Sequence, residues 1–385
     1  MLRQTYLLLS SLPRVARRFS TTQITKSRVC VIGAAGNVGQ PLSLLLKRDS
    51  RITGLALYDI KLAAGVAMDI LHVDTNSLVA GYDKIENIQK ALECADVVII
   101  VAGLPRKKGM SDDELFKKNA GIIVEIMPKI AETCPKALIA MVTSPINSLV
   151  PLAAEILKTK NVYDPNHLFG VSTPHVVRTR YFMGDVLQVD PARVDVPVIG
   201  GCSKCTILPI LSQCKPHFKL EDEHDALPIV KKVRNAEEEV AKAKGDRAAA
   251  SLVIAHSVAK FTSSLLLGLS GLGDPIECSY VESVATECAF FATPLKLGKK
   301  GIDKNLGLPE MTNFEMDWMN ELIPELKENI KKGVEFAKKK DKGENEGQAF
   351  SQNIDMRGNS NKAKDFRIFL NNFAEILIPP GHYTD

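Results

Sequence analysis

The chain has 385 residues, of which 45% are apolar and 24% are charged, and its formal net charge at pH 7 is +4. This composition is ordinary for a globular protein, and no run approaches the roughly 18 consecutive apolar residues that span a membrane. Four arginines among residues 1–20 supply the whole charge excess, so the remainder is neutral and lacks the basic surface of a nucleic-acid-binding protein. We therefore expect neither nucleic acid nor a membrane as a partner.

The first segment, residues 1–24, has the composition of a mitochondrial transit peptide. It contains Arg3, Arg14, Arg17 and Arg18, and the first acidic residue of the chain is Asp49. Segments that carry arginine and serine but no acid direct proteins to mitochondria. A secretory signal is the alternative, but the apolar run at residues 7–9 is short for one. We predict import into the mitochondrial matrix and a mature chain that starts near residues 20–25.

Residues 25–170 are predicted to form an α/β domain with a doubly wound parallel sheet. Apolar runs of strand length occur at residues 28–34, 52–60, 95–103 and 137–143, and helical patterns lie between them at 38–47 and 112–130. Continuous apolar strands are typical of a sheet that is covered on both faces, and strands that alternate with helices pair in parallel.

From about residue 171 the pattern changes, and residues 171–340 are predicted to form a second, α+β domain. Strands are expected at residues 193–199 and 277–281, with a hairpin turn at 298–301. Long helical patterns occur at residues 226–244, 248–266 and 312–339. Helices of this length beside a few strands favour an α+β layer rather than a continued alternation.

A glycine-rich loop follows the first predicted strand and opens the first predicted helix. Gly33, Gly36 and Gly39 allow a tight turn and let backbone N–H groups approach a pyrophosphate at the positive end of a helix. Asp59 ends the next strand, twenty residues after Gly39. A carboxylate at this place accepts the ribose hydroxyls and repels a 2′-phosphate, so the spacing predicts NAD rather than NADP.

Several longer peptides resemble the mitochondrial malate dehydrogenase family. They are the glycine loop with residues 40–46, and residues 102–107, 196–201 and 298–301; the resemblance extends from about residue 27 to 339. It implies a Rossmann-type NAD-binding domain, a catalytic-type domain of the lactate/malate dehydrogenase kind, and a homodimer. It also implies the family reaction of the tricarboxylic acid cycle, in which malate and NAD give oxaloacetate and NADH.

The resemblance assigns a nearly complete set of residues to the cofactor. They are Gly33, Ala34, Ala35, Gly36, Asn37, Val38, Gly39, Asp59, Asn119, Val142 and Thr143. Two departures lie nearby: Ile254 stands where the family has a methionine near the nicotinamide, and the loop at residues 245–248 lacks the usual small residues.

The substrate positions are different, because four of them carry other residues. Arg106 and Arg178 stand at two of the three arginines that hold the substrate in this family, and Asp112 stands at the third. Ser144 stands at an orienting asparagine, His175 at an aspartate, and Cys202 at the histidine that accepts the hydroxyl proton. A thiol with a pKa of about 8.5 is a poor base at neutral pH, and loss of a positioned base costs about 10²–10⁴-fold in rate. We therefore predict NAD binding, weak binding of a small dicarboxylate, and absent or strongly impaired catalysis.

Two other functions are compatible with the same residues. The first is an active NAD-dependent malate or other 2-hydroxy acid dehydrogenase with a displaced base. The second is a thiol redox or metal-binding protein, in which Cys202 and His175 form a reactive pair or join Cys205 in a CxxC or metal site. The irregular ligand spacing disfavours a metal, and the main prediction includes none. Most of the eight cysteines lie in apolar contexts and are expected to be buried free thiols.

The last segment, residues 341–385, extends beyond the family resemblance. Residues 338–361 are charged and rich in Gly, Ser and Asn, which predicts a flexible linker. Six large apolar residues then share one face of a predicted helix: Phe366, Phe369, Leu370, Phe373, Ile376 and Leu377. Such a helix either folds back on its own domain or docks on a protein partner, and the sequence favours neither.

Overall fold

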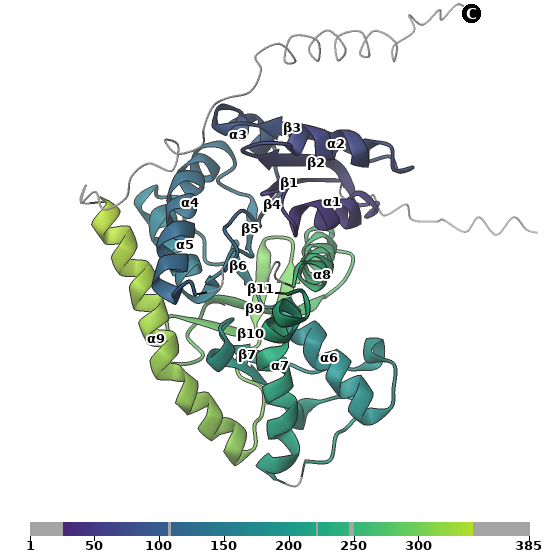
Figure 1. Ribbon diagram of the computed structural model, residues 1–385, viewed down its shortest axis with the longest axis vertical. Coiled ribbons are helices and arrows are strands. Elements are labelled where there is room, and N and C mark those ends of the chain that lie inside the picture. The colour runs from purple at the N-terminus through teal and green to yellow at the C-terminus, as the bar shows by residue number, and fades with distance from the viewer. Residues whose placement is uncertain (1–25, 107–108, 221, 246–249, 342–385) are drawn as a thin grey trace, which may run out of the picture. The chain divides into compact units, whose positions relative to one another are not determined.

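Runs of apolar residues build an eleven-stranded sheet in the computed structural model (Figure 1). The structure describes residues 26–106, 109–220, 222–245 and 250–341. The strands are β1 Ser27–Ile32, β2 Ile52–Asp59, β3 Leu78–Asp83, β4 Val97–Ile100, β5 Leu138–Met141, β6 Leu168–Val171, β7 Val198–Gly200, β8 Ile207–Pro209, β9 Ile276–Glu282, β10 Phe290–Gly298 and β11 Gly301–Asn305. Their order in the sheet is β3-β2-β1-β4-β5-β6-β9-β10-β7-β8, and β11 pairs with β10.

Six strands from the first half of the chain pair in parallel. Val31 of β1 lies opposite Leu57 of β2 on one side and Ile99 of β4 on the other. The chain moves outward from β1 to β3 and then crosses back to β4, so the strand order reverses between β1 and β4. In open α/β sheets, ligands bind beyond the carboxyl ends of the strands at such a reversal. The predicted parallel, doubly wound sheet is therefore confirmed.

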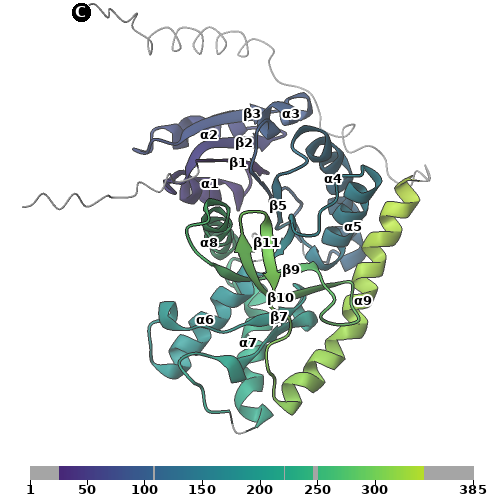
Figure 2. The same cartoon turned by 180° about the vertical axis from the view of Figure 1, so that it is seen from behind.

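Nine α-helices of the described residues cover this sheet. They are α1 Gly39–Lys47, α2 Ala63–Leu71, α3 Ile88–Leu92, α4 Asp112–Thr133, α5 Ile146–Thr159, α6 Thr173–Leu187, α7 Glu223–Ala243, α8 Ser251–Ser270 and α9 Asn313–Asp341, with short 3₁₀ helices at Ile85–Asn87, Pro191–Arg193, Lys204–Thr206 and Leu211–Gln213. One apolar core lies under α4, α5 and α9; Figure 2 shows these three helices from behind. A second core lies under α1, α2 and α8. The sheet is thus buried on both faces, as its continuous apolar strands require.

Capping residues determine where two of these helices begin. Ser111 caps α4 by accepting a hydrogen bond from the Glu114 N–H at 3.2 Å. At α9, Glu315 accepts from the Thr312 N–H at 2.9 Å, and Thr312 Oγ1 accepts from the Glu315 N–H at 3.4 Å. This reciprocal pair is a capping box, which satisfies two otherwise unpaired donors of the first turn.

The second half of the chain continues the same sheet with antiparallel strands. Gly170 of β6 lies opposite Tyr280 of β9, and β9, β10, β7 and β8 follow in antiparallel pairs. Gly298 faces Gly301 across the β10–β11 hairpin, which confirms the predicted turn. The predicted α+β region with its long helices is also present; the boundary between residues 170 and 171 stays a prediction.

One sequence prediction of a strand was too long. Residues 193–199 were expected to be extended, but only the end of this stretch joins the sheet, in β7. Pro191–Arg193 forms a 3₁₀ turn that Asp190 caps, and Asp195 makes an isolated bridge with Lys215. The apolar pattern of Val194 and Val196 reflects burial in a local cluster rather than pairing in the sheet.

α8 is long and apolar enough to cross a membrane by length and composition alone. Its inner face lies in the core, where Phe261 packs edge to face on Phe169 of β6 with ring centroids 5.6 Å apart. This contact is that of a core helix. The first residues of the predicted linker, 338–341, are not a linker but the end of α9. The predicted transit peptide, the departing loop residues 246–248, and the rest of the predicted linker with the C-terminal helix lie outside the described residues.

Candidate functional site

The glycine loop after β1 makes a turn at the carboxyl edge of the sheet that is tightly packed on its inner side and open on its outer side. Gly33 has a φ of +95°, and a Cβ there would lie 2.4 Å from the backbone nitrogen of Ala102. A Cβ at Gly39 would lie 2.1 Å from the Gly33 carbonyl oxygen. At Gly36, which is exposed, a Cβ would meet only that same oxygen, at 3.3 Å, and nothing else nearby. Two glycines thus close the turn, while the third leaves its outer surface free for a pyrophosphate, so the loop fits a dinucleotide.

Asp59 lies beside this loop at the end of β2. One carboxylate oxygen accepts a hydrogen bond from the Ala35 N–H at 3.0 Å, and the other accepts from the Ile60 N–H at 2.8 Å. Burial raises the pKa of the Asp59 carboxyl above its usual value, although the backbone N–H groups of Ala35, Ile60 and Lys61 act in the opposite direction. A carboxylate has about four acceptor sites, so Asp59 is held beside the loop and can still accept a ribose hydroxyl.

Asn119 and Thr143 brace the loop that follows β4. Asn119 Oδ1 accepts from the Leu104 N–H at 2.8 Å, and its Nδ2 donates to the Leu104 and Ser144 carbonyls at 3.2 and 2.7 Å. Thr143 Oγ1 donates to the Ala102 carbonyl at 2.7 Å. Because the backbone takes both amide protons and the hydroxyl proton, these two side chains position the cofactor loop. We expected direct contacts from the sequence, and that role stays a prediction, as does the one for half-buried Val142 at the end of β5.

Arg106 and Asp112 form an ion pair with each other. The guanidinium of Arg106 donates to the Asp112 carboxylate and also, at 3.4 Å, to the Met110 carbonyl. Both side chains are exposed, Arg106 by 53% and Asp112 by 79%. Asp112 is the first residue of α4, where the positive end of the helix favours an acid. The one arginine that the resemblance retains on this loop is therefore already neutralised.

The loop that carries Cys202 is tied to the first turn of α5. Asn147 Oδ1 accepts from the Cys202 N–H at 2.7 Å, and Asn147 Nδ2 donates to Ser203 Oγ and Thr206 Oγ1 at 3.0 and 3.1 Å. Asn147 follows Ser144 and cis-bonded Pro145 in the chain, so this clamp places Cys202 near the carboxyl end of β5. Burial raises the pKa of the Cys202 thiol to about 12, so the thiol is neutral at physiological pH.

His175 and Arg178 lie in the first turns of α6, which begins just past the carboxyl end of β6. They are 6% and 7% exposed, and neither His175 Nδ1 nor Arg178 Nη2 has a hydrogen-bond partner in the structure. Burial, and then the charge of Arg178, lower the pKa of His175 to about 3. Burial also lowers the pKa of Arg178. The site therefore combines a neutral imidazole with a buried guanidinium that has a donor to spare.

The structure does not support the reactive-thiol alternative. No hydrogen bond joins His175 to Cys202, and both groups are neutral, whereas a reactive pair needs a thiolate beside an imidazolium. Cys205 is exposed, and burial together with the neighbouring Glu325 raises the pKa of its thiol. All eight cysteines are free, and no cluster of three or more metal-binding side chains occurs among the residues that the structure describes. A redox CxxC motif needs a cysteine whose pKa is lowered, whereas the pKa values of Cys202 and Cys205 are both raised.

Matches to two family models cover most of the chain. Residues 27–170 match the lactate/malate dehydrogenase NAD binding domain, and residues 175–337 match the lactate/malate dehydrogenase alpha/beta C-terminal domain. The chain belongs to the lactate/malate dehydrogenase family. NAD is its cofactor, as the glycine loop and Asp59 predict.

Relatives of known identity place the chain with the malate dehydrogenases of this family. It is 45% identical over 337 residues to mitochondrial malate dehydrogenase of Bos taurus, a match that covers 86% of this chain and 99% of the relative. It is 46% identical over 323 residues to the mitochondrial enzyme of Citrullus lanatus, which covers 84% and 93%. The crystal structure of Cryptosporidium parvum malate dehydrogenase superposes with a TM-score of 0.69, covering 81% of this chain and 99% of that one, and at 22% identity it shows the fold.

Sequence reasoning missed Asn147. It stands two residues after Pro145, and no local pattern reveals that its amide reaches residues 55–59 positions further along the chain. The one available signal was a polar amide in an otherwise apolar helix, where a buried amide needs partners. The structure also places Ile254 at the edge of the second core.

Proposed function

We propose that this malate dehydrogenase family protein binds NAD(H) but turns over malate at most very slowly. The observation that carries the proposal is that His175 and Cys202, the two titratable residues at the proton-handling positions, are both neutral and share no hydrogen bond. NAD, when bound, supplies the hydride acceptor. Oxidation of a hydroxyl group also needs a base with a pKa near the working pH, and neither residue supplies one.

We also propose that the ligand of this site differs from the dicarboxylate of the family reaction. Arg106 is paired with Asp112, so a second carboxylate would have to compete with Asp112 for its charge. Arg178 keeps an unpartnered donor in a buried place, where a charge-assisted hydrogen bond is strong. This arrangement favours a ligand with one carboxylate over a dicarboxylate, and the free donor of Arg178 is the group that we propose would bind that carboxylate.

We further propose that the protein is a homodimer in the mitochondrial matrix. The Bos taurus and Citrullus lanatus relatives are mitochondrial enzymes, and residues 1–24 have the composition of a transit peptide. Exposed apolar side chains on α2 and α8, which both pack beside α1, support an interface: Met68, Leu71 and Leu252 are 43%, 50% and 67% exposed. Sedimentation of the protein and of L252E tests it; a monomeric wild-type protein would contradict the dimer.

Two measurements on the purified protein test the main proposal. Fluorescence titration with NADH should give saturable binding, because the glycine loop and Asp59 are in place. Malate-dependent NADH formation should be at least about a thousand-fold below that of the Bos taurus enzyme assayed in parallel. Ordinary turnover would contradict the loss of catalysis, and absence of saturable binding at millimolar NADH would contradict the cofactor site.

A further inference from the structure

A second pocket lies at the opposite edge of the sheet from the cofactor loop. It has a volume of about 380 Å³ and is formed by the segments that precede β4, β5 and β6, together with the end of α8 and the β10–β11 turn. Its lining is Cys94, Ala95, Asp96, Thr133, Cys134, Pro135, Lys136, Ala137, Leu138, His167, Leu269, Lys299 and Lys300. Because these strands are parallel, their amino ends lie at the edge away from Gly33 and Asp59. The pocket therefore shares no wall with the site described above.

The charged groups of this pocket are mostly cationic. Lys136, Lys299 and Lys300 line it, and none of them forms an ion pair with any described residue. Asp96 is the acid of the lining, and one of its oxygens accepts from the Arg28 N–H at 2.8 Å. Three unpaired ammonium groups around one cavity raise the local concentration of anions.

The backbone segments that carry the lysines are fixed to one another. Ile302, next to the β10–β11 turn, donates its N–H to the Asn166 carbonyl at 3.1 Å, and a Cβ at Gly301 would lie 2.2 Å from the same oxygen. Ile139 donates to the His167 carbonyl at 2.7 Å, and Leu138 donates to the Asp96 carbonyl at 2.9 Å. The segments that carry the lysines thus form a preorganised backbone frame, which lowers the entropic cost of binding a ligand.

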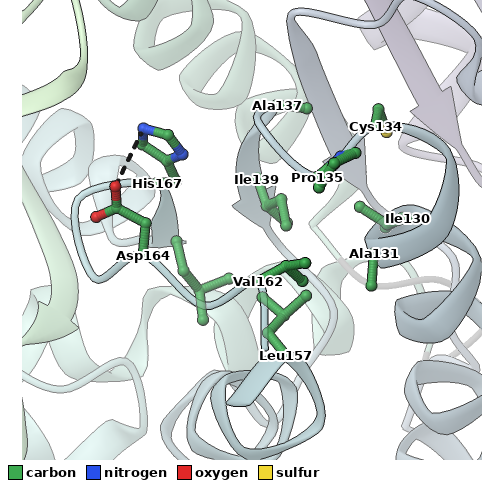
Figure 3. A pocket seen from close by; sticks show the side chains of 11 residues that line it. Ile130, Ala131, Cys134, Pro135, Ala137, Ile139, Leu157, Val162, Asp164 and His167 are labelled. Atoms are coloured by element: carbon green, nitrogen blue, oxygen red, sulfur yellow. Dashed lines mark ion pairs between the residues drawn. The ribbon is translucent and has the colours of Figure 1, made fainter. Parts of the chain in front are cut away.

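A smaller, mostly apolar cavity adjoins the pocket. Figure 3 shows the adjoining cavity, which shares Cys134, Pro135, Ala137 and His167 with the larger pocket and is otherwise lined mainly by apolar side chains. His167 is drawn toward Asp164 there, with Nε2 3.6 Å from the carboxylate. This inner space is about 10 Å³, which holds no more than about one water molecule. A ligand must therefore occupy the outer, lysine-lined part.

We propose that this pocket binds a small multivalent anion that carries carboxylate or phosphate groups. Its volume is in the range of small-molecule sites. Lysine recognises such groups as a point charge with rotatable donors, and it does not demand the planar geometry of a single carboxylate. The site is independent of malate turnover, because none of its residues lies at the cofactor edge.

Two exposed cysteines give the test an internal control. Cys94 lies on the wall of the pocket, and Cys205 lies elsewhere, next to Glu325. Alkylation rates at both thiols are measured by mass spectrometry with anionic iodoacetate and with neutral iodoacetamide. The ratio of the two rates cancels differences in thiolate content. We expect the ratio to be about three-fold higher at Cys94, because two net positive charges attract the anionic reagent.

Ligand binding is read in the same assay with NADH present to occupy the cofactor site. Citrate and pyrophosphate, added separately, should slow iodoacetamide at Cys94 and leave Cys205 unchanged; the anion that acts at the lower concentration identifies carboxylate or phosphate as the preferred group. In K299Q/K300Q the rate ratio at Cys94 should fall to that at Cys205, and neither anion should protect Cys94. The matched double variant K338Q/K339Q, which changes two exposed lysines of α9, should retain both the higher ratio and the protection. Equal ratios at the two cysteines, no protection by either anion at millimolar concentration, or protection that survives K299Q/K300Q would overturn the proposal.

Discussion

The guanidinium of Arg106 donates a hydrogen bond to the carboxylate of Asp112, six residues later. The pair joins the segment after β4 to the first residue of α4, and the two opposite charges offset each other. Ser111 caps the helix, and its positive end stabilises Asp112, so the pair stabilises the local structure while it removes a charge from the site. The Asp112 carboxylate would also repel a dianionic ligand that approached Arg106.

The first prediction is that D112N restores affinity for a dicarboxylate. The change frees Arg106 and removes one negative charge, which is worth about 1 kcal/mol near a surface, or about five-fold in affinity. Binding of hydroxymalonate to the NADH complex should strengthen by this factor, while binding of the monocarboxylate oxamate should change less than two-fold. Calorimetric titration measures both.

Asp113 supplies the matched control for this experiment. It is the next residue of the same helix turn, and its carboxylate pairs with Lys332 of α9 instead of with Arg106. D113N should therefore leave both affinities unchanged. An equal gain in D112N and D113N would mean that general charge, and not the Arg106 pair, controls binding.

The second prediction concerns recovery of catalysis. C202H alone should stay inactive, because the family resemblance puts the imidazole beside position 175, where this chain has a neutral histidine and not an aspartate. D112R, S144N, H175D and C202H combined should raise malate turnover by at least about 10²-fold over C202H. Steady-state assays measure this, with circular dichroism to confirm folding. A fully active C202H single variant would show that no anionic partner is needed.

The third prediction follows from the burial of His175. Its folded pKa of about 3 lies below the unfolded value of about 6.5, so the unfolded state binds the extra proton between these values. The stabilisation is complete above pH 6.5 and is lost as pH falls toward 3. H175L should therefore lose less stability on acidification. Between pH 6.5 and 5 the difference should be about 1.6 kcal/mol, measured by urea unfolding.

Exposed His72, at the end of α2, provides the comparison for that measurement. The H72L variant should follow the wild-type pH dependence. If H175L and wild type lost the same stability between pH 6.5 and 5, His175 would not be the group that takes up the proton.

The sequence predicted the parts of the site that depend on short-range patterns. The glycine loop, Asp59 and the hairpin turn were placed correctly because each needs only a strand end and nearby residues. The Arg106–Asp112 pair was not foreseen, since the two were treated as separate substrate positions. The Asn147 clamp on Cys202 and the role of Asn119 as a brace arise from contacts far apart in sequence, for which one sequence has no local signal. Strands as short as β7 and β8, of three residues each, likewise depend on partners elsewhere in the sheet.

The last prediction separates cofactor binding from folding at the glycine loop. A methyl group at Gly39 would collide with backbone at 2.1 Å, so that position cannot distinguish the two effects. At Gly36 the methyl group would meet only the Gly33 oxygen at 3.3 Å, so G36A should fold with nearly the wild-type melting temperature. Its methyl group would lie where a pyrophosphate approaches the backbone, and NADH affinity should fall at least about ten-fold. G121A in α4, where a Cβ meets nothing within 4 Å, should leave that affinity unchanged. Fluorescence titration and thermal melts of the three proteins decide the matter: wild-type NADH affinity in folded G36A would mean that the cofactor does not lie against this loop.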